Sequence, residues 1–159
     1  WRQVQTRGRY AEYPRVTHAA MVHPQHATWL LIHGGYGGDG PTLEFLDDLC
    51  VLDTDSLSWH DLNPSGSPPP ARGYHSMTNL AGRAVVFGGK TKQRADKEQH
   101  SLWAYDPLTS AWEQPTVAAG GPHAQPRSNH AATGVGGGMA VVHGGRVKKE
   151  RLDDLWLLQ

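Results

Sequence analysis

Short apolar runs, separated by turn-forming residues, recur along the whole chain. The clearest are three runs that each precede a pair of glycines, at 31–33, 85–87 and 141–143. Val, Ile, Leu, Phe, Tyr and Trp within the runs, with Gly, Pro, Asn and Asp between them, are typical of strands and turns. The runs are continuous rather than alternating, which indicates sheets covered on both faces. Because no segment shows the helical period of about 3.6 residues, the pattern predicts an all-β fold.

The same features recur in the same order in three successive units, as in a repeat protein. Each unit opens with an arginine that a histidine follows three positions later, and the arginines are 57 and 55 residues apart. A glycine pair closes the next apolar run, and in two units a tryptophan lies six residues after the aspartate that ends the following apolar run. Trp1 matches this tryptophan one unit earlier. The recurring residues are Arg15, Arg72, Arg127, Gly34, Gly35, Gly88, Gly89, Gly144, Gly145, Trp59 and Trp112.

Each unit predicts four short strands. The first lies near 18–22, 75–79 and 130–135, and the second is the apolar run that ends at the glycine pair. The third ends near Asp53 or Asp106, and the fourth surrounds the tryptophan. An aspartate can accept a hydrogen bond from the backbone N–H two residues further on. Asp53 and Asp106 therefore predict tight hairpins between the third and fourth strands.

The order Arg-x-x-His, Gly-Gly, aromatic-x-Asp and Trp resembles the kelch family over essentially the whole chain. The resemblance implies an all-β, partial kelch β-propeller over 1–159, with about three four-stranded antiparallel blades. The recurring residues fall at 15–59, 72–112 and 127–159, and 1–14 would be the end of a preceding blade plus a linker. Two departures stand out: Leu52 replaces the usual tyrosine, which Tyr105 supplies, and Gln159 replaces the aspartate.

Three blades do not close a ring, because propellers have about four to eight. Stacked repeats bury their cores only against their neighbours. We therefore expect this chain to be a segment of a longer one, or the remaining blades to come from another chain.

A residue that occurs once per blade is spread around the ring, so we expect the recurring residues to be structural. The glycines satisfy a backbone that needs positive φ or close approach, and the tryptophans fill the gap between adjacent blades. The three arginines are expected to bridge carbonyls or acids between blades. Three histidines are expected to satisfy local hydrogen bonds: His18, His75 and His130.

Composition excludes several classes of protein. With 15 basic and 15 acidic residues the formal charge is zero, so no global field favours nucleic acid or an anionic membrane. The one cysteine, Cys50, permits no intrachain disulfide, and no apolar run approaches the roughly 20 residues that span a bilayer. We expect an intracellular protein, most simply cytoplasmic, with cytoskeletal, ciliary and nuclear locations open.

The long loops are predicted to emerge on one face of the disc, after strands two and four, and loops on a rigid scaffold carry binding groups. Two of these loops are basic and belong to neighbouring units. The hypothesis is that they form one ridge that binds an acidic segment of a partner protein, and the alternative is that they are ordinary solvated loops. The candidate residues are Lys90, Lys92, Arg94, Lys97, Arg146, Lys148, Lys149 and Arg151.

No catalytic, cofactor-binding or metal-binding residue is assigned. His23 and His26 are three apart but have no third ligand nearby, and Cys50 lies in a strand, where a buried structural thiol is usual. The sequence therefore predicts a protein–protein interaction or scaffold module rather than an enzyme. The alternative is a kelch-type enzyme, or an accessory domain of a phosphatase or ubiquitin-ligase adaptor, with its catalytic residues outside this segment.

Overall fold

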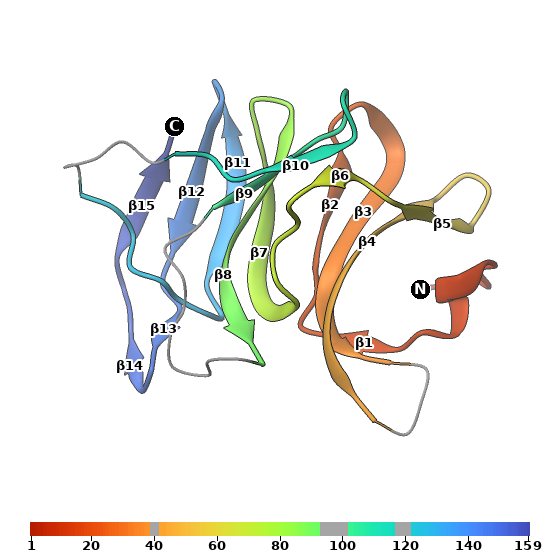
Figure 1. Ribbon diagram of the computed structural model, residues 1–159, viewed down its shortest axis with the longest axis horizontal. Helices are drawn as coiled ribbons and strands as arrows, with labels where there is room; N and C mark the ends of the chain where they lie inside the picture. The colour runs from red at the N-terminus through yellow and green to blue at the C-terminus, as the bar shows by residue number, and fades with distance from the viewer. Residues whose placement is uncertain (39–41, 93–101, 117–121) are drawn as a thin grey trace.

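Three antiparallel sheets stand side by side in chain order, like adjacent sectors of a disc (Figure 1). The computed structural model describes residues 1–38, 42–92, 102–116 and 122–159. The first, second and third repeat units each form one sheet, which we call the first, second and third blade. The N- and C-termini lie at opposite ends of the row. The predicted all-β fold of a partial kelch propeller is confirmed.

The first blade contains four antiparallel strands in chain order. They are β2 (Ala19–His23), β3 (His26–Gly37), β4 (Glu44–Asp53) and β5 (Ser58–Leu62). A short strand, β1 (Arg15–Val16), pairs with the far end of β3. Before it, the 3₁₀ helix η1 (Arg9–Glu12) lies against the outer face of the blade, where Tyr10 packs with Ile32 and Cys50.

The second blade repeats this order and adds one strand. Its antiparallel strands are β7 (Arg72–Leu80), β8 (Arg83–Thr91), β9 (Trp103–Asp106) and β10 (Ala111–Glu113). The linker that leaves the first blade contributes β6 (Ser65–Gly66), which pairs in parallel with β10. Arg7 forms the same parallel bridge to Ser58 in the first blade. The predicted four-strand blade thus gains a fifth, parallel partner from the preceding linker.

The third blade has three strands and a small hairpin. The strands are β11 (Ala131–Gly136), β12 (Met139–His143) and β15 (Leu155–Leu158). The hairpin, β13 (Arg146–Val147) with β14 (Glu150–Arg151), lies between β12 and β15. Strands β3 and β8 continue through their glycine pairs, whereas β12 ends just before its pair.

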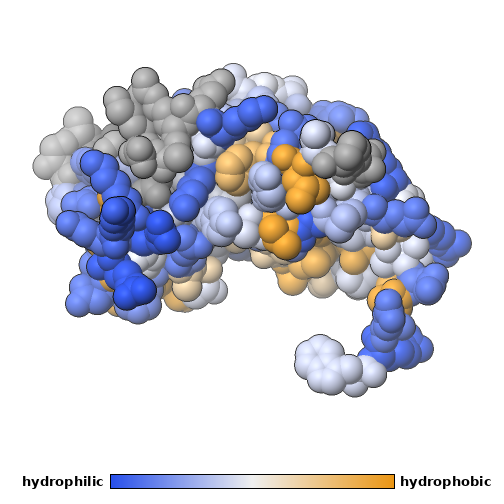
Figure 2. Space-filling view, turned by 90° about the horizontal axis from the view of Figure 1, so that it is seen from below, coloured by the Kyte–Doolittle hydropathy of each residue, from blue (hydrophilic) through white to orange (hydrophobic). Residues whose placement is uncertain are grey.

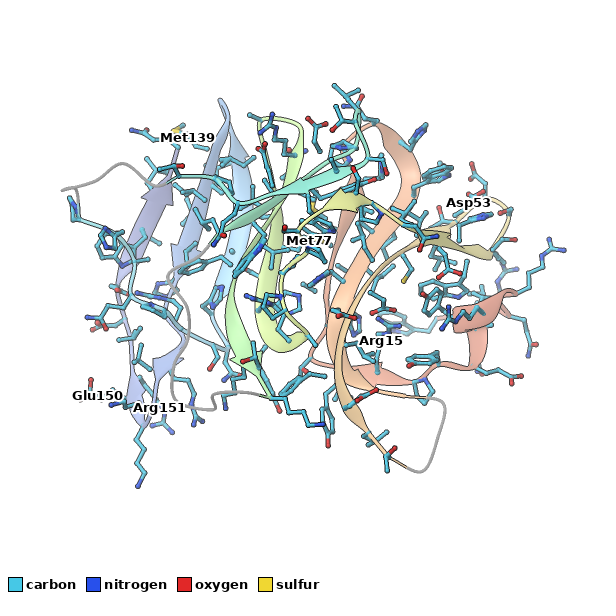
Figure 3. The ribbon with its side chains drawn as sticks, viewed as in Figure 1. Arg15, Asp53, Met77, Met139, Glu150 and Arg151 are labelled. Atoms are coloured by element: carbon cyan, nitrogen blue, oxygen red, sulfur yellow. The ribbon has the colours of Figure 1, made fainter. Side chains whose placement is uncertain are left out.

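Aspartates close the hairpins between the third and fourth strands, as their positions indicated. The Asp53 side chain accepts from the Asp55 N–H at 3.0 Å, and the Asp106 side chain accepts from the Leu108 N–H at 2.8 Å. In Figure 1 the β9–β10 turn lies at the top of the molecule and the β4–β5 turn at the right, where Figure 3 labels Asp53. Both connections are short turns, whereas β3 and β8 end at the lower edge of the blades.

The main core lies between the first two blades. Leu31 and Val51 from the first blade and Val86 from the second are fully buried in it. Trp112 is 4% exposed and packs in the same cluster, whereas Trp59 packs on the opposite face of the first blade and donates its indole N–H to Thr6. Burial of large apolar side chains between sheets stabilises the arrangement of the blades.

The glycine pairs of the first two blades sit where a carbonyl oxygen of neighbouring backbone leaves no room for a Cβ. Gly88 has φ +69°, and a Cβ there would lie 2.3 Å from the carbonyl oxygen of Arg127 in the third blade. Gly82 also has positive φ, +83°, but no atom lies within 4 Å of a Cβ there. The glycine at 88 is therefore required by close approach as well as by conformation.

We expect Gly88→Ala to destabilise the chain by about 3 kcal/mol or more, because backbone strain and a backbone clash act together. Gly82→Ala carries the strain alone and should cost about 1 kcal/mol. Thermal unfolding of the two variants checks this difference, and equal losses would show that the clash at 88 is relieved at no cost.

The recurring arginines bind within their own blades, which corrects the expectation that they bridge neighbouring blades. Each donates its Nη1 to the carbonyl of the first glycine in its own pair, at 3.0, 2.8 and 2.9 Å. Arg15 also forms a two-bond ion pair with Asp48, and Arg127 does so with Asp154. The arginines therefore tie the start of each blade to its own glycine turn.

Two of the recurring histidines bind across blades, which corrects the expectation of local hydrogen bonds. His75 of the second blade lies 3.0 Å from the Nδ1 of His33 in the first. His130 of the third blade lies 2.8 Å from the hydroxyl of Ser76 in the second, and its ring contacts Phe87. The histidine that opens a blade is thus held by the blade before it.

In each case the opening histidine is received by one of two cross-strand neighbours on the preceding blade. Ala19 is the cross-strand neighbour of His33, and in the second blade Ser76 is the neighbour of Phe87. Each pair offers the next blade one hydrogen-bonding group: an imidazole beside alanine, or a hydroxyl beside phenylalanine. The third blade carries the first type again, as Ala131 opposite His143.

Candidate partner-binding face

Strands β3 and β8 both end at one edge of the blades, at the bottom of Figure 1. The β13–β14 hairpin, which follows β12, lies at the same edge. We call this surface the long-loop face. Figure 2 views the molecule from this side, with hydrophobic residues near the middle and hydrophilic ones around them.

A chain of backbone hydrogen bonds joins the blades at the centre of this face. The Tyr74 N–H donates to the carbonyl of Thr17 at 2.9 Å, and the Asn129 N–H donates to the carbonyl of Tyr74 at 3.1 Å. These three residues occupy the same position, one before the histidine, and all have positive φ, from 57° to 62°. The side chains at this position are therefore held in a fixed relation to one another.

A second set of equivalent residues surrounds the first. Tyr36, Lys90 and Arg146 each follow a glycine pair directly. Each lies opposite the residue that follows the recurring arginine of its own blade. We call the two sets together the inner set: Thr17, Tyr36, Tyr74, Lys90, Asn129 and Arg146.

The first-blade side of the inner set is aromatic. Tyr36 and Phe45 are cross-strand neighbours whose rings meet edge to face at 5.3 Å. The Phe45 ring also lies against Gly73, where a Cβ would approach it to 3.0 Å. Tyr36 and Tyr74 remain 37% and 36% exposed, and Val16 beside them is 59% exposed. The face therefore has an accessible aromatic and apolar centre.

The third-blade side is basic. Lys90 places its ammonium 5.1 Å from the centre of the Tyr74 ring. In the hairpin, Arg146 and Arg151 are direct cross-strand neighbours, and Lys148 and Lys149 form the exposed turn. Figure 3 shows Arg151 at the lower end of the third blade.

A series of contacts within the inner set connects Lys90 at the first basic loop with Arg146 at the second. Lys90 contacts Tyr74, Tyr74 is bonded to Asn129, and Ser128 exchanges two backbone hydrogen bonds with Arg146, at 3.0 and 2.9 Å. Lys92 is exposed next to the end of β8. The remaining two predicted residues of the ridge, Arg94 and Lys97, lie outside the described residues.

Charge changes sign across the face. Glu44 and Asp47 of the first blade are exposed, whereas Asp48 forms an ion pair with Arg15. The acidic, aromatic and basic regions follow one another from the first blade to the third. A partner that matches this order is oriented by it, because opposite charges attract and like charges repel.

Within the described parts of the chain, no group of three or more His, Cys, Asp or Glu is arranged to hold a metal ion. Cys50 is fully buried, and burial raises the pKa of its thiol to about 12. The rings of His23, His26 and Trp29 contact one another, and His23 meets Trp29 edge to face. None of the helices among the described residues has the length and hydrophobicity that a membrane span requires.

The sequence predicts the basic loops as a binding surface but does not predict the aromatic residues of the long-loop face. Tyr36, Phe45 and Tyr74 all fall outside the predicted strands, and no role was predicted for them. A signal was present: the positions just before the histidine and just after the glycine pair differ in every unit. Variable residues at fixed framework positions are what a recognition surface on a repeat scaffold requires.

The chain is similar in sequence to a family of known proteins. The whole of 1–159 matches the model of the KLHDC2/KLHL20/DRC7 Kelch-repeats domain. The rat Rab9 effector protein with kelch motifs is 36% identical over 145 residues, which cover 89% of this chain and 37% of the relative. Host cell factor of Drosophila melanogaster is 34% identical over 128 residues, covering 72% of this chain and 8% of the relative.

A third relative is the flagellar outer-arm dynein alpha chain of Chlamydomonas reinhardtii, 35% identical over 106 residues, which cover 64% of this chain and 2% of the relative. The chain thus spans less than two fifths of the length of these relatives. The match over every residue, the three blades and the recurring arginines, histidines and glycines agree. The chain belongs to the kelch-repeat family.

Proposed function

We propose that this chain is a protein-interaction module that binds its partner through the long-loop face. The observation that carries the proposal is the inner set, in which variable side chains are held on a framework of backbone hydrogen bonds between blades. Kelch relatives described as an effector protein and as a host cell factor support a binding role. Catalysis by residues of this chain is not part of the proposal.

The partner is proposed to carry an apolar or aromatic residue next to an acidic segment. Tyr36, Phe45 and Tyr74 offer an exposed aromatic centre, and aromatic side chains contribute much of the binding energy at interfaces. Lys90 and the β13–β14 hairpin place positive charge on one side of that centre. The acidic segment would lie toward the third blade.

Reversal of three hairpin charges, by Lys148→Glu, Lys149→Glu and Arg151→Glu together, is expected to weaken partner binding by about tenfold or more and to reduce its salt dependence. Tyr74→Ala should weaken binding with little change in salt dependence, because it removes contact area rather than charge. Partners recovered with the wild-type chain and identified by mass spectrometry are titrated against each variant at two salt concentrations.

Arg2→Glu is the matched control for Lys149→Glu. Both residues are exposed and both substitutions change the charge by the same amount, but Arg2 lies in the N-terminal segment. Equal loss of binding for these two single variants would show that only net charge matters, and would remove the ridge from the proposal.

The remaining propeller blades, in the same or another chain, are proposed as a second partner. Leu155 and Leu157 are 69% and 55% exposed, whereas their first-blade equivalents Leu49 and Val51 are 3% and 0% exposed against the second blade. A further blade would cover this face of the third.

We also propose an intracellular location, with the flagellar dynein relative favouring a cytoskeletal or ciliary one.

A further inference from the structure

The two halves of β4 differ at the edge that faces away from β3. Strand β5 pairs with the half from Leu49 to Asp53 and ends at Leu62. The half from Glu44 to Asp48 continues along β3, and within the described parts of the chain no strand pairs with its other edge. In Figure 1, β4 runs on below the point where β5 leaves it. A strand edge of this kind presents backbone N–H and C=O groups with which another strand can pair.

A groove of about 520 Å³ lies beside this edge. Its volume is typical of the pockets in which proteins bind ligands, about 300 to 1,000 Å³. Residues 44–49 of β4 line it, together with η1 and the linker that follows β5. The aromatic and proline residues among those that line it are Tyr10, Tyr13, Phe45, Pro64, Pro68 and Trp112. The free half of β4 is therefore bordered by apolar side chains.

The sequence explains why β5 does not extend along the whole of β4. Asn63 and Pro64 follow Leu62, and proline has no N–H to donate to a neighbouring strand. The linker then pairs with β10 of the second blade through Ser65 and Gly66. The first blade's own fourth strand thus leaves the edge at Leu62, and the second blade holds the segment that follows.

The groove carries more negative than positive charge. The charged residues that line it, among those described, are Arg9, Glu44, Asp47, Asp48 and Asp61. Asp48 is already paired with Arg15, whereas Glu44 and Asp47 are exposed. Asp61 accepts a hydrogen bond from the Tyr10 hydroxyl at 2.5 Å. Its pairing with the exposed Arg9 is loose, at 3.9 Å, so a basic group on a ligand would meet acidic side chains here.

This charge narrows what can pair with the edge. A second copy of this chain would bring the same acidic strand, and like charges directly opposite one another on paired strands are destabilising. The acidic segment proposed for the long-loop face is disfavoured for the same reason. An extended segment with basic side chains gains both backbone hydrogen bonds and electrostatic attraction.

We propose that residues 45–48 are a docking edge for an extended, basic segment of a partner protein, which adds to the first blade as a strand in this groove. Side chains alternate along a strand, and the Phe45 ring lies against Gly73 of the second blade. Asp47 therefore shares the side of β4 that faces the second blade, and a lysine or arginine of the added strand pairs with it there. The inference does not rest on the proposed function, because the basic hairpin takes no part in it.

The first experiment titrates an acetylated and amidated hexapeptide of alternating lysine and valine into the full chain by calorimetry. Asp47→Lys should weaken binding by about tenfold, because it places like charges together. Asp55→Lys is the matched control: it makes the same change at an exposed aspartate in the β4–β5 turn and should bind as the wild type does. Equal losses for the two variants would show that only net charge matters and would overturn the proposal.

The second experiment tests the strand pairing itself by amide hydrogen exchange. The peptide should slow exchange within 45–48, and the same peptide with its two central residues N-methylated should bind at least tenfold more weakly, because it lacks two backbone donors. Reversal of the hairpin charges should leave the affinity for the lysine–valine peptide within about twofold of wild type, whatever it does to the partner of the long-loop face. Unchanged exchange within 45–48, or equal affinity for the two peptides, would overturn the docking edge and leave the proposed function untouched.

Discussion

Acidification from pH 7 to pH 5 is expected to destabilise the chain by several kcal/mol, because the blades are joined through neutral histidines. Burial lowers the pKa of His33 to about 3 and that of His130 to about 4. Burial also lowers the pKa of His75 well below its usual range, and nearby Arg72 adds to this effect. All three rings are therefore uncharged in the folded chain at neutral pH.

The direction of the pH effect follows from these shifts. In the unfolded chain a histidine has a pKa of about 6.5, so as the pH falls the unfolded chain takes up protons first. The stabilising contribution is complete above pH 6.5 and is lost progressively below it. For His33 alone the loss at pH 5 is about 2 kcal/mol, from about 1.4 kcal/mol per pH unit.

Urea unfolding between pH 7.5 and 4.5 measures this loss. The control is the double variant Ala19→Ser with His33→Phe, which copies the Ser76 and Phe87 pair of the second blade. It removes one titrating ring while supplying His75 with a hydroxyl partner. Its stability should fall less steeply with acid than that of the wild type, and parallel curves would contradict the role of His33.

Trp112→Ala is expected to reduce the free energy of unfolding by about 3 to 5 kcal/mol, as large truncations in well-packed cores do. The indole is 4% exposed and contacts the ring of Tyr105 in its own blade and that of His33 in the first, at 5.6 and 5.5 Å. Truncation would leave a cavity between the first two blades that these neighbours cannot fill.

Trp59→Ala is the comparison, because Trp59 holds the equivalent place in the first blade but is only partly buried. It should cost less than Trp112→Ala in the same unfolding experiment. A smaller loss at 112 than at 59 would mean that the interface between the blades does not depend on the indole.

The sequence was informative where the backbone demands particular residues. Glycine pairs with positive φ and apolar runs fall at the same place in every unit, and the turn aspartates do so in the first two, so the order of the strands could be predicted from the spacing. The parallel strand β6 gave no such signal, because two residues, Ser65 and Gly66, are too few to show a period. Its pairing depends on the tertiary position of the linker.

The hydrogen-bonding partners of buried polar groups were harder to predict from the sequence than the strands were. The distance from Arg15 to Asp48 or from His75 to His33 along the chain says nothing of direction in space. Only the fold shows that the arginine turns back into its own blade while the histidine reaches the one before it. The aromatic centre was missed because Tyr36 and Tyr74 lie outside the predicted strands and far apart along the chain, so the sequence does not show that they share one face.

The two kinds of pair that receive the opening histidine have a consequence for how such chains can be enlarged. The third blade presents Ala131 and His143, the same combination that the first blade offers as Ala19 and His33. The Nδ1 of His33 receives His75, whereas the Nδ1 of His143 lies 3.0 Å from the carbonyl oxygen of Asp154. A copy of the second blade could therefore follow the third once this contact is given up. Gene duplication could lengthen the array one unit at a time, because each added blade would meet an equivalent pair of residues on the blade before it.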